Sequence, residues 1–284
     1  MKRHVSTILL IVIFLVGLSL LLYPSFSDWW NSFHQSRAVA SYIGTVANLG
    51  NEEYDRMWDE AYAYNAELAE KSLNLQLTEE EVTAYEKLLD VSGGGIMGYV
   101  DIPKIKVTLP VYHGTDEAVL QVAVGHIPGT SLPVGGKSSH CVISGHRGLP
   151  RARLFTDIDR LVAGDVFTLN IMDEVLTYEV DQIRIVLPHE LDDLSIEEGK
   201  DYCTLVTCTP YGVNTHRLLV RGHRVETKQT NIVRVTADAL QVEPTLVAIV
   251  IAVPMLLILI FALLITTGIQ RKHNHRRGTG TDEE

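Results

Sequence analysis

One cysteine of this chain stands where it could act as a nucleophile. In TLVTCTPYGVNTHRLLVRGHR, residues 204–224, Cys208 ends an apolar run and is followed by Thr-Pro. Proline donates no hydrogen bond to a sheet, so the strand must open into a loop just after Cys208. Side chains at such exits are exposed and well placed for chemistry. A cysteine suits acyl transfer when a cationic or basic neighbour supports its thiolate and a donor binds the oxyanion that forms.

Two further residues could complete this chemistry. His146 is the best placed of the eleven histidines, because CVISGH reads as a strand that ends at Gly-His and RGLP follows it. Arg217 begins the strand after the Cys208 loop, within a hairpin's reach, and its guanidinium keeps its charge. Each residue type also has an ordinary structural role, since a lone cysteine is often a small buried hydrophobe. The residues alone therefore support only a hypothesis of Cys–His acyl transfer.

The elements that must position these residues fall into two kinds. Residues 28 to about 90 predict helices: Met57, Trp58 and Ala61 follow helical spacing, and Thr78 with Glu81 forms a capping box. From Ile96 the chain turns to short β-type runs separated by Gly and Pro, which indicate a mainly β sandwich or barrel. LFTDIDRLVAGD, between two such runs, predicts a short helix and a turn.

Two uncharged apolar segments predict membrane helices. Val5–Ser27 and Pro244–Gln270 carry no charge, and about 20 apolar residues span a bilayer. YPSFSDWW offers no Ala-x-Ala site, so an uncleaved anchor is favoured over a signal peptide. Lys and Arg flank both segments on their outer sides, and positive flanks stay cytoplasmic. We therefore expect both termini inside the cell and the segment between about residues 28 and 243 outside.

The motifs that carry the chemistry resemble the sortase family of Gram-positive surface transpeptidases. The Cys208 stretch with its downstream arginine is similar to the Thr-Leu-x-Thr-Cys signature of sortases, and SGHRGLP is similar to their histidine motif. HIPGTSLPVGG, at 126–136, also resembles the family. The resemblance covers about residues 90–225. It implies an eight-stranded β-barrel in which Cys208 is the nucleophile, His146 the acid/base and Arg217 the stabiliser of substrate and oxyanion.

The arrangement around the barrel resembles class C sortases, the pilin polymerases. It combines a membrane helix at each end with a helical segment before the barrel, and GGGIMGYVDIPKI is similar to their entry into the barrel. This resemblance implies cleavage of a Leu-Pro-x-Thr-Gly-like sorting signal through a thioacyl-enzyme, which a lysine amine of a pilin subunit resolves. Three alternatives stay open: a sortase that attaches proteins to a cell-wall amine, a hydrolytic cysteine protease, and a non-catalytic surface module.

The resulting boundaries follow the composition of the chain. We expect an N-terminal flank and anchor at 1–27, a helical, lid-like segment at 28–95, the catalytic barrel at 96–227, a linker at 228–243, a second membrane helix at 244–270, and a cytoplasmic tail at 271–284.

Many class C sortases cover the active site with a lid anchored by Asp-Pro-aromatic. This chain has no proline between Pro24 and Pro103, so that anchor is absent. Either a different lid fills the site, for which Tyr85 and Trp58 are candidates, or the site has no plug.

The remaining cysteines and the overall charge limit other functions. Cys141 and Cys203 each lie five residues before a candidate site residue, an odd offset that places them on the opposite face of neighbouring strands. They could be buried free thiols or a disulfide. A net charge of −11 argues against a nucleic-acid partner. No metal-ligand spacing is recognisable, so we expect no metal or cofactor, and the expected partners are sorting-signal proteins and the bilayer.

Overall fold

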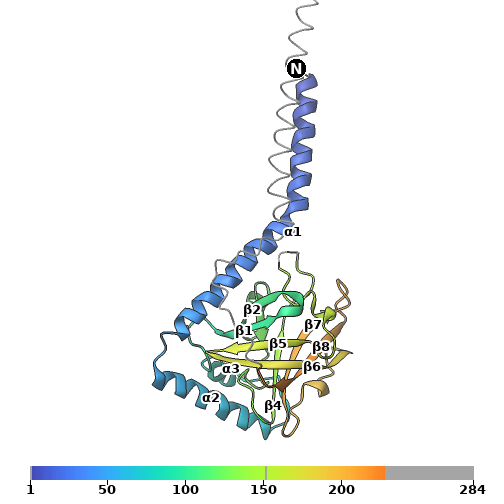
Figure 1. Cartoon of the computed structure of the whole chain (residues 1–284). Coiled ribbons are helices and arrows are strands. Elements are labelled where there is room, and N and C mark those ends of the chain that lie inside the picture. Colours follow the sequence, from blue (N-terminus) through green and yellow to red (C-terminus); the bar gives the residue numbers. More distant parts are fainter. Residues whose placement is uncertain (1, 151, 228–284) are drawn as a thin grey trace, which may run out of the picture. The chain divides into compact units, whose positions relative to one another are not determined.

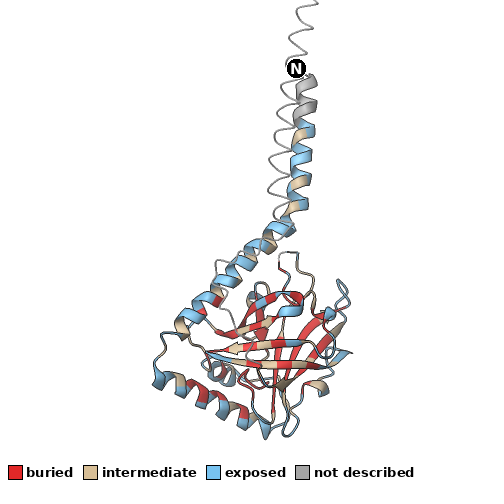
Figure 2. Ribbon diagram, viewed as in Figure 1, coloured by how far each residue is buried: buried red, intermediate tan, exposed pale blue. Residues whose placement is uncertain are grey.

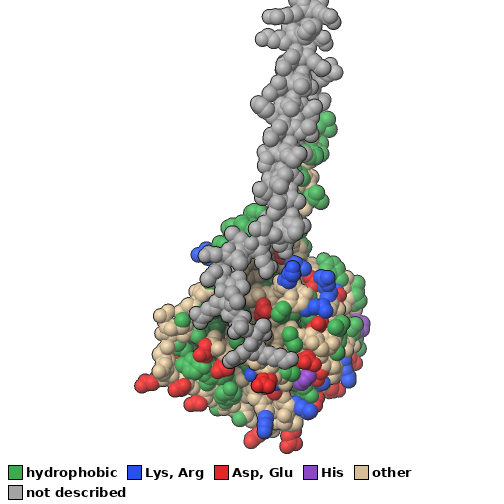
Figure 3. Space-filling model, viewed as in Figure 1, with side chains coloured by type: hydrophobic (Ala, Val, Ile, Leu, Met, Phe, Trp, Pro, Cys, Tyr) green, Lys and Arg blue, Asp and Glu red, His purple; other side chains and the backbone are tan. Residues whose placement is uncertain are grey.

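The computed structural model of this 284-residue chain describes residues 2–150 and 152–227. The linker, second membrane helix and tail that the sequence predicts from residue 228 onward lie outside the described residues. In the described part, three helices precede a β-barrel (Figure 1). The protein is acidic, and Figure 3 shows carboxylates along the edge of the molecule where α2 runs.

The first helix joins the apolar N-terminus to the barrel. α1 (Lys2–Val46) is one continuous helix, and from Leu9 it is long and apolar enough to cross a membrane by length and composition. Its second half contacts the barrel: Gln35 donates to the carbonyl oxygen of Val122 at 2.7 Å, and the Asp28 carboxylate accepts from the backbone N–H of Arg153 at 2.9 Å. The sequence predicts helix from residue 28 onward, and α1 confirms this prediction as far as Val46.

Two shorter helices pack onto the barrel. α2 (Asn51–Ala69) buries Met57, Trp58 and Ala61, which are on the face that the spacing predicts. α3 (Glu79–Tyr85) begins with the predicted capping box, in which Thr78 accepts from the backbone N–H of Glu81 and the Glu81 carboxylate accepts in return. These contacts satisfy backbone N–H groups at the start of the helix that would otherwise lack hydrogen-bond partners.

The barrel has eight strands and is closed, as the resemblance implies. Its order is β1-β2-β3-β4-β7-β8-β6-β5. The β2–β3 and β4–β7 pairs are parallel, and the others are antiparallel. The predicted helix near residue 158 is a short 3₁₀ turn, Ile158–Arg160. The strands are β1 (Ile96–Ile102), β2 (Val107–His113), β3 (Val124–His126), β4 (Ser139–Ser144), β5 (Val166–Ile171), β6 (Glu174–Val186), β7 (Asp201–Thr209) and β8 (His216–Val225).

Successive residues of a strand face opposite sides of a sheet, and this alternation separates core from site. On β7, Cys203 and Leu205 belong to the main core cluster inside the barrel, whereas Val206 belongs to a separate small cluster on the outer side. Figure 2 shows this buried interior along the strands. Cys208 shares the parity of Val206, so the barrel presents it outward.

A single tyrosine links α1 to two places on the barrel. The buried hydroxyl of Tyr42 donates to the carbonyl oxygen of Met97 and accepts from the N–H of Met172, each at 2.8 Å. Leaving such buried groups without partners costs about 1–3 kcal/mol.

We predict that Tyr42→Phe lowers the melting temperature of the full chain in detergent by about 5 °C, measured by circular dichroism. Tyr62→Phe, a half-exposed control on α2, should leave it unchanged; equal shifts would contradict the prediction.

Candidate active site

Cys208 and Arg217 face each other across a strand pair. The register of antiparallel β7 and β8 makes them direct partners, which places their side chains on the same face at about 5 Å between Cβ atoms. The sequence predicts that Arg217 lies within a hairpin's reach of Cys208, and the strand register confirms this. The Arg217 guanidinium also donates to the carbonyl oxygens of Asn214 and His216, at 3.3 and 3.1 Å. These bonds tie the cation to the loop that follows Cys208.

His146 follows the end of β4, the other strand that pairs with β7. Parallel β4 pairs with β7 up to Ser144 and Val206, and two bonds extend the pairing. The backbone N–H of Gly145 donates to Val206 at 3.0 Å, and the Thr207 hydroxyl donates to the Gly145 carbonyl at 2.7 Å. His146 and Cys208 therefore lie at the same ends of adjacent strands.

A glycine just before the histidine sets the direction of the imidazole. A Cβ atom at Gly145 would lie 2.7 Å from Phe155 and 2.8 Å from Val124. Gly145 therefore faces the packed core, and His146, the next residue, faces outward as Cys208 does. The backbone N–H of Phe155 donates to the His146 carbonyl at 3.1 Å and holds this turn. The structure thus brings together all three residues that the sequence singles out.

A carboxylate that the sequence does not reveal stands beside the histidine. Oε2 of Glu117, in the short helix α4 (Glu117–Leu120), lies 3.8 Å from Nε2 of His146. The other oxygen of Glu117 accepts from the Gln121 side-chain amide. Nε2 of His146 is buried and has no hydrogen-bond partner within the described residues. No motif marks Glu117, because only the packing of α4 against the site brings it near His146.

An apolar patch continues the outer face from Cys208. Val142, Val206 and Leu219 of strands β4, β7 and β8 cluster there with Leu194. Leu219 is the direct partner of Val206, one step along the same face from the Cys208–Arg217 pair. This apolar patch is therefore a buried cluster on the outer face of the strands, next to the Cys208–Arg217 pair.

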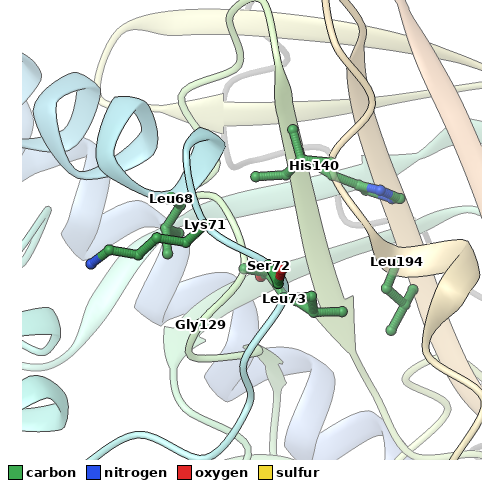
Figure 4. Close-up of a pocket in the computed structure, with 9 residues that line it drawn as sticks. Leu68, Lys71, Ser72, Leu73, Gly129, His140 and Leu194 are labelled. Carbon is green, nitrogen blue, oxygen red and sulfur yellow. The ribbon is translucent and has the colours of Figure 1, made fainter.

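Leu73, in the connection between α2 and α3, packs onto this apolar patch. Figure 4 shows Leu73 between the β4 strand that carries His140 and the turn that carries Leu194. The two lid candidates from the sequence lie elsewhere: Trp58 belongs to the main core, and the buried Tyr85 hydroxyl bonds to Nδ1 of His126 at 2.8 Å. Leu73 is therefore one of four partly buried side chains that cover the patch; the others are Ile127, Val186 and Leu191.

The other two cysteines form a buried pair. Cys141 and Cys203 are register partners on β4 and β7, and both are buried free thiols. Burial raises the pKa of Cys203 well above its usual value, so this thiol stays protonated. Their place on the face opposite Cys208 agrees with the predicted offset. Among residues 2–150 and 152–227, no group of three or more His, Cys, Asp or Glu side chains could hold a metal ion.

Residues 100–225 match the sortase domain family. Sortase C1 of Streptococcus agalactiae is 50% identical, with 68% of this chain and 100% of that one covered and a TM-score of 0.66. Sortase C of Streptococcus pneumoniae is 42% identical, with 67% and 97% covered and a TM-score of 0.60. Sortase D of Bacillus subtilis (strain 168) is 30% identical, and the match covers 46% of this chain and 65% of that protein.

The match to Streptococcus agalactiae sortase C1 covers that whole chain at 50% sequence identity. It defines the class of this protein as a β-barrel enzyme of the cysteine transpeptidase type. This chain belongs to the sortase family, and its structural neighbours are class C sortases.

The Thr207–Gly145 bond offers a test of how the site is positioned. We predict that Thr207→Val slows alkylation of Cys208 by iodoacetamide about fivefold, because Gly145, before His146, keeps only its backbone bond to Val206 as a link to β7, and a displaced imidazole would support the thiolate less well. Intact mass measures this rate. Thr177→Val, which removes a hydrogen bond from β6 to Thr227, two residues after the end of β8, is the control. Equal slowing in both variants would mean a general loss of stability.

The Leu73 contact generates a second test. We predict that Leu73→Ala speeds alkylation of Cys208 by a bulky maleimide about fivefold, since loss of a half-buried leucine contact weakens the cover by about 1 kcal/mol. Glu70→Ala, an exposed change at the start of the same connection, should have no effect. A rate unchanged in Leu73→Ala would show that the connection does not restrict access to the thiol.

Proposed function

We propose that this chain is a membrane-anchored class C-type sortase that polymerises pilins. The observation that carries the proposal is the 50% identity to Streptococcus agalactiae sortase C1 across that whole chain. A related structure, of Clostridium perfringens sortase C, is 43% identical and was solved with the C-terminal cell wall sorting motif. The Streptococcus pneumoniae enzyme was described with respect to pilin substrate specificity. These features of the neighbours support a sorting signal and a pilin as substrates of this chain.

Cys208, His146 and Arg217 have distinct roles in the proposed first step. The Cys208 thiolate attacks the threonine carbonyl carbon of a Leu-Pro-x-Thr-Gly-like signal. Arg217, the strand partner of Cys208, donates to the oxyanion as charge develops on it. The C–N bond to glycine then breaks, and the His146 imidazolium gives its proton to the leaving amine. A thioacyl-enzyme remains.

In the second step a lysine amine of the next pilin attacks the thioester carbon. Its proton passes to His146, the C–S bond breaks, and Cys208 leaves as a thiolate. The product is an isopeptide bond between subunits. Splitting the transfer in two allows a nucleophile other than water to complete it.

The proposed anchoring uses both ends of the chain. α1 carries the first span, and the uncharged segment 244–270 is proposed as the second. Basic flanks on both favour cytoplasmic termini and an extracellular barrel. The domain boundaries expected from the sequence, including the barrel at 96–227 and the helical segment at 28–95, remain part of this proposal.

The first experiment follows the acyl-enzyme by intact mass. The full chain in detergent is incubated with a Leu-Pro-x-Thr-Gly peptide and a lysine-bearing acceptor, beside Cys208→Ala. We predict an adduct in the unmodified chain that passes to lysine, and none in Cys208→Ala, because no other described cysteine is exposed.

The products separate the alternatives. Transfer only to a cell-wall-type amine would favour an anchoring sortase, and hydrolysis despite added amine would favour a protease. Full activity in Cys208→Ala would contradict the assignment of the nucleophile.

A further inference from the structure

A groove of about 450 Å³ lies on the histidine side of the site. Its walls come from the α2–α3 connection, from α3, and from the loops before α4 and after β3. Leu75, Leu77, Val82 and Ile127 supply apolar surface, and Glu86 and Asp116 supply carboxylates. The volume is within the range of small-molecule sites, about 300–1,000 Å³. It is therefore large enough for a long side chain and its neighbouring backbone.

One residue that lines the groove is next in the chain to a neighbour of His146. Asp116, which lines the groove, directly precedes Glu117, and Oε2 of Glu117 lies 3.8 Å from Nε2 of His146. That nitrogen is buried and has no hydrogen-bond partner in the described part of the chain. A group in the groove therefore approaches the site from the side of His146. The apolar patch with Val206 adjoins the groove, because Ile127 lines the groove and also packs against the patch.

The charge of the groove selects among possible occupants. Glu86 and Asp116 are exposed, and no Lys, Arg or His occurs among the described residues that line it. Three further carboxylates occupy the first turn of α3 above it. Apolar walls with acidic groups at the rim match a lysine, whose methylene stem packs against apolar surface while its ammonium stays near carboxylates. An acidic peptide segment would be repelled by these carboxylates, and a purely apolar one would leave them without a partner.

We propose that this groove admits the lysine side chain of the acceptor protein, with Asp116 and Glu86 attracting its ammonium. The proposal rests on the proposed function, which requires an amine as second substrate. The groove supplies an entry path that meets the apolar patch at Ile127, so the acceptor arrives beside the acyl chain.

The protons balance along this path. The lysine enters as an ammonium and releases one proton to water. The neutral amine attacks the thioester carbon, and its second proton passes to Nε2 of His146, which restores the imidazolium. A C–N bond forms, the C–S bond breaks, and Cys208 leaves as a thiolate. Oε2 of Glu117 lies 3.8 Å from the nitrogen that accepts this proton.

The test compares a charged and an uncharged nucleophile on the same thioacyl-enzyme. The full chain in detergent is acylated with a Leu-Pro-x-Thr-Gly peptide and given either Nα-acetyl-lysine methylamide or hydroxylamine, which is uncharged at neutral pH. In the double variant Glu86→Gln, Asp116→Asn, the ratio of lysine to hydroxylamine transfer should fall about threefold to tenfold, through a higher KM for lysine, as expected for two exposed charge pairs.

A matched variant controls for net charge. Asp55→Asn with Glu60→Gln removes two exposed carboxylates from α2, and the ratio should stay at the wild-type value. Added salt should lower the wild-type ratio and leave that of the groove variant nearly constant.

Each other result overturns the proposal. An unchanged ratio in the groove variant would show that lysine does not use the groove, and an equal fall with both nucleophiles would show that these carboxylates shape the site without selecting charge. If no thioacyl-enzyme forms in the wild type, the proposed function fails first, and a failure of the groove alone is recognised because the acyl-enzyme still forms.

Discussion

The hydrogen bonding of β7 on both of its edges is the constraint on which the site depends. Antiparallel β8 sets Arg217 opposite Cys208, and parallel β4 brings His146 to the same end of the barrel. A strand pair allows only register steps of whole residues, and a one-residue slip would turn each side chain to the other face. The backbone ladder therefore positions all three candidate residues, Cys208, His146 and Arg217.

The alternation of side chains along a strand gives the three cysteines different environments. Cys141 and Cys203 are neighbours in the interior, where burial keeps the Cys203 thiol protonated, while Cys208 is half-exposed on the outer face. Two kinds of thiol thus lie on one strand, separated by the direction of their side chains. The outer face also carries Val206 and Leu219, so the apolar patch and Cys208 lie on the same side of the barrel wall.

The helical segment before the barrel does more than connect it to a membrane. Its connection between α2 and α3 sets Leu73 on the apolar patch and forms one wall of the groove near His146. One short stretch of chain therefore borders both surfaces through which, under the proposed function, the two substrates arrive. A movement of this stretch would alter access to both.

The fold and the three site residues were within reach of the sequence because their signals are local or are carried by motifs. Proline after Cys208 ends a strand, and a hairpin keeps Arg217 close, since few residues separate the two strands. The capping box of Thr78 and Glu81 is complete within four residues. His146 lies much earlier in the chain, and its place at a strand-to-loop exit and its resemblance to a motif singled it out before the β4–β7 pairing was seen.

The sequence by itself determined the mainly β character, the N-terminal apolar helix and the absence of the Asp-Pro-aromatic anchor, and it singled out Cys208 as the candidate nucleophile. Only the tertiary structure decided that Leu73 covers the apolar patch in place of Tyr85 or Trp58, and that Glu117 stands beside His146. The physical reason is the range of the interactions. Capping, turns and alternation act over a few residues and leave a pattern in the sequence, whereas a covering side chain or a charge partner is set by packing between segments far apart, which leaves none.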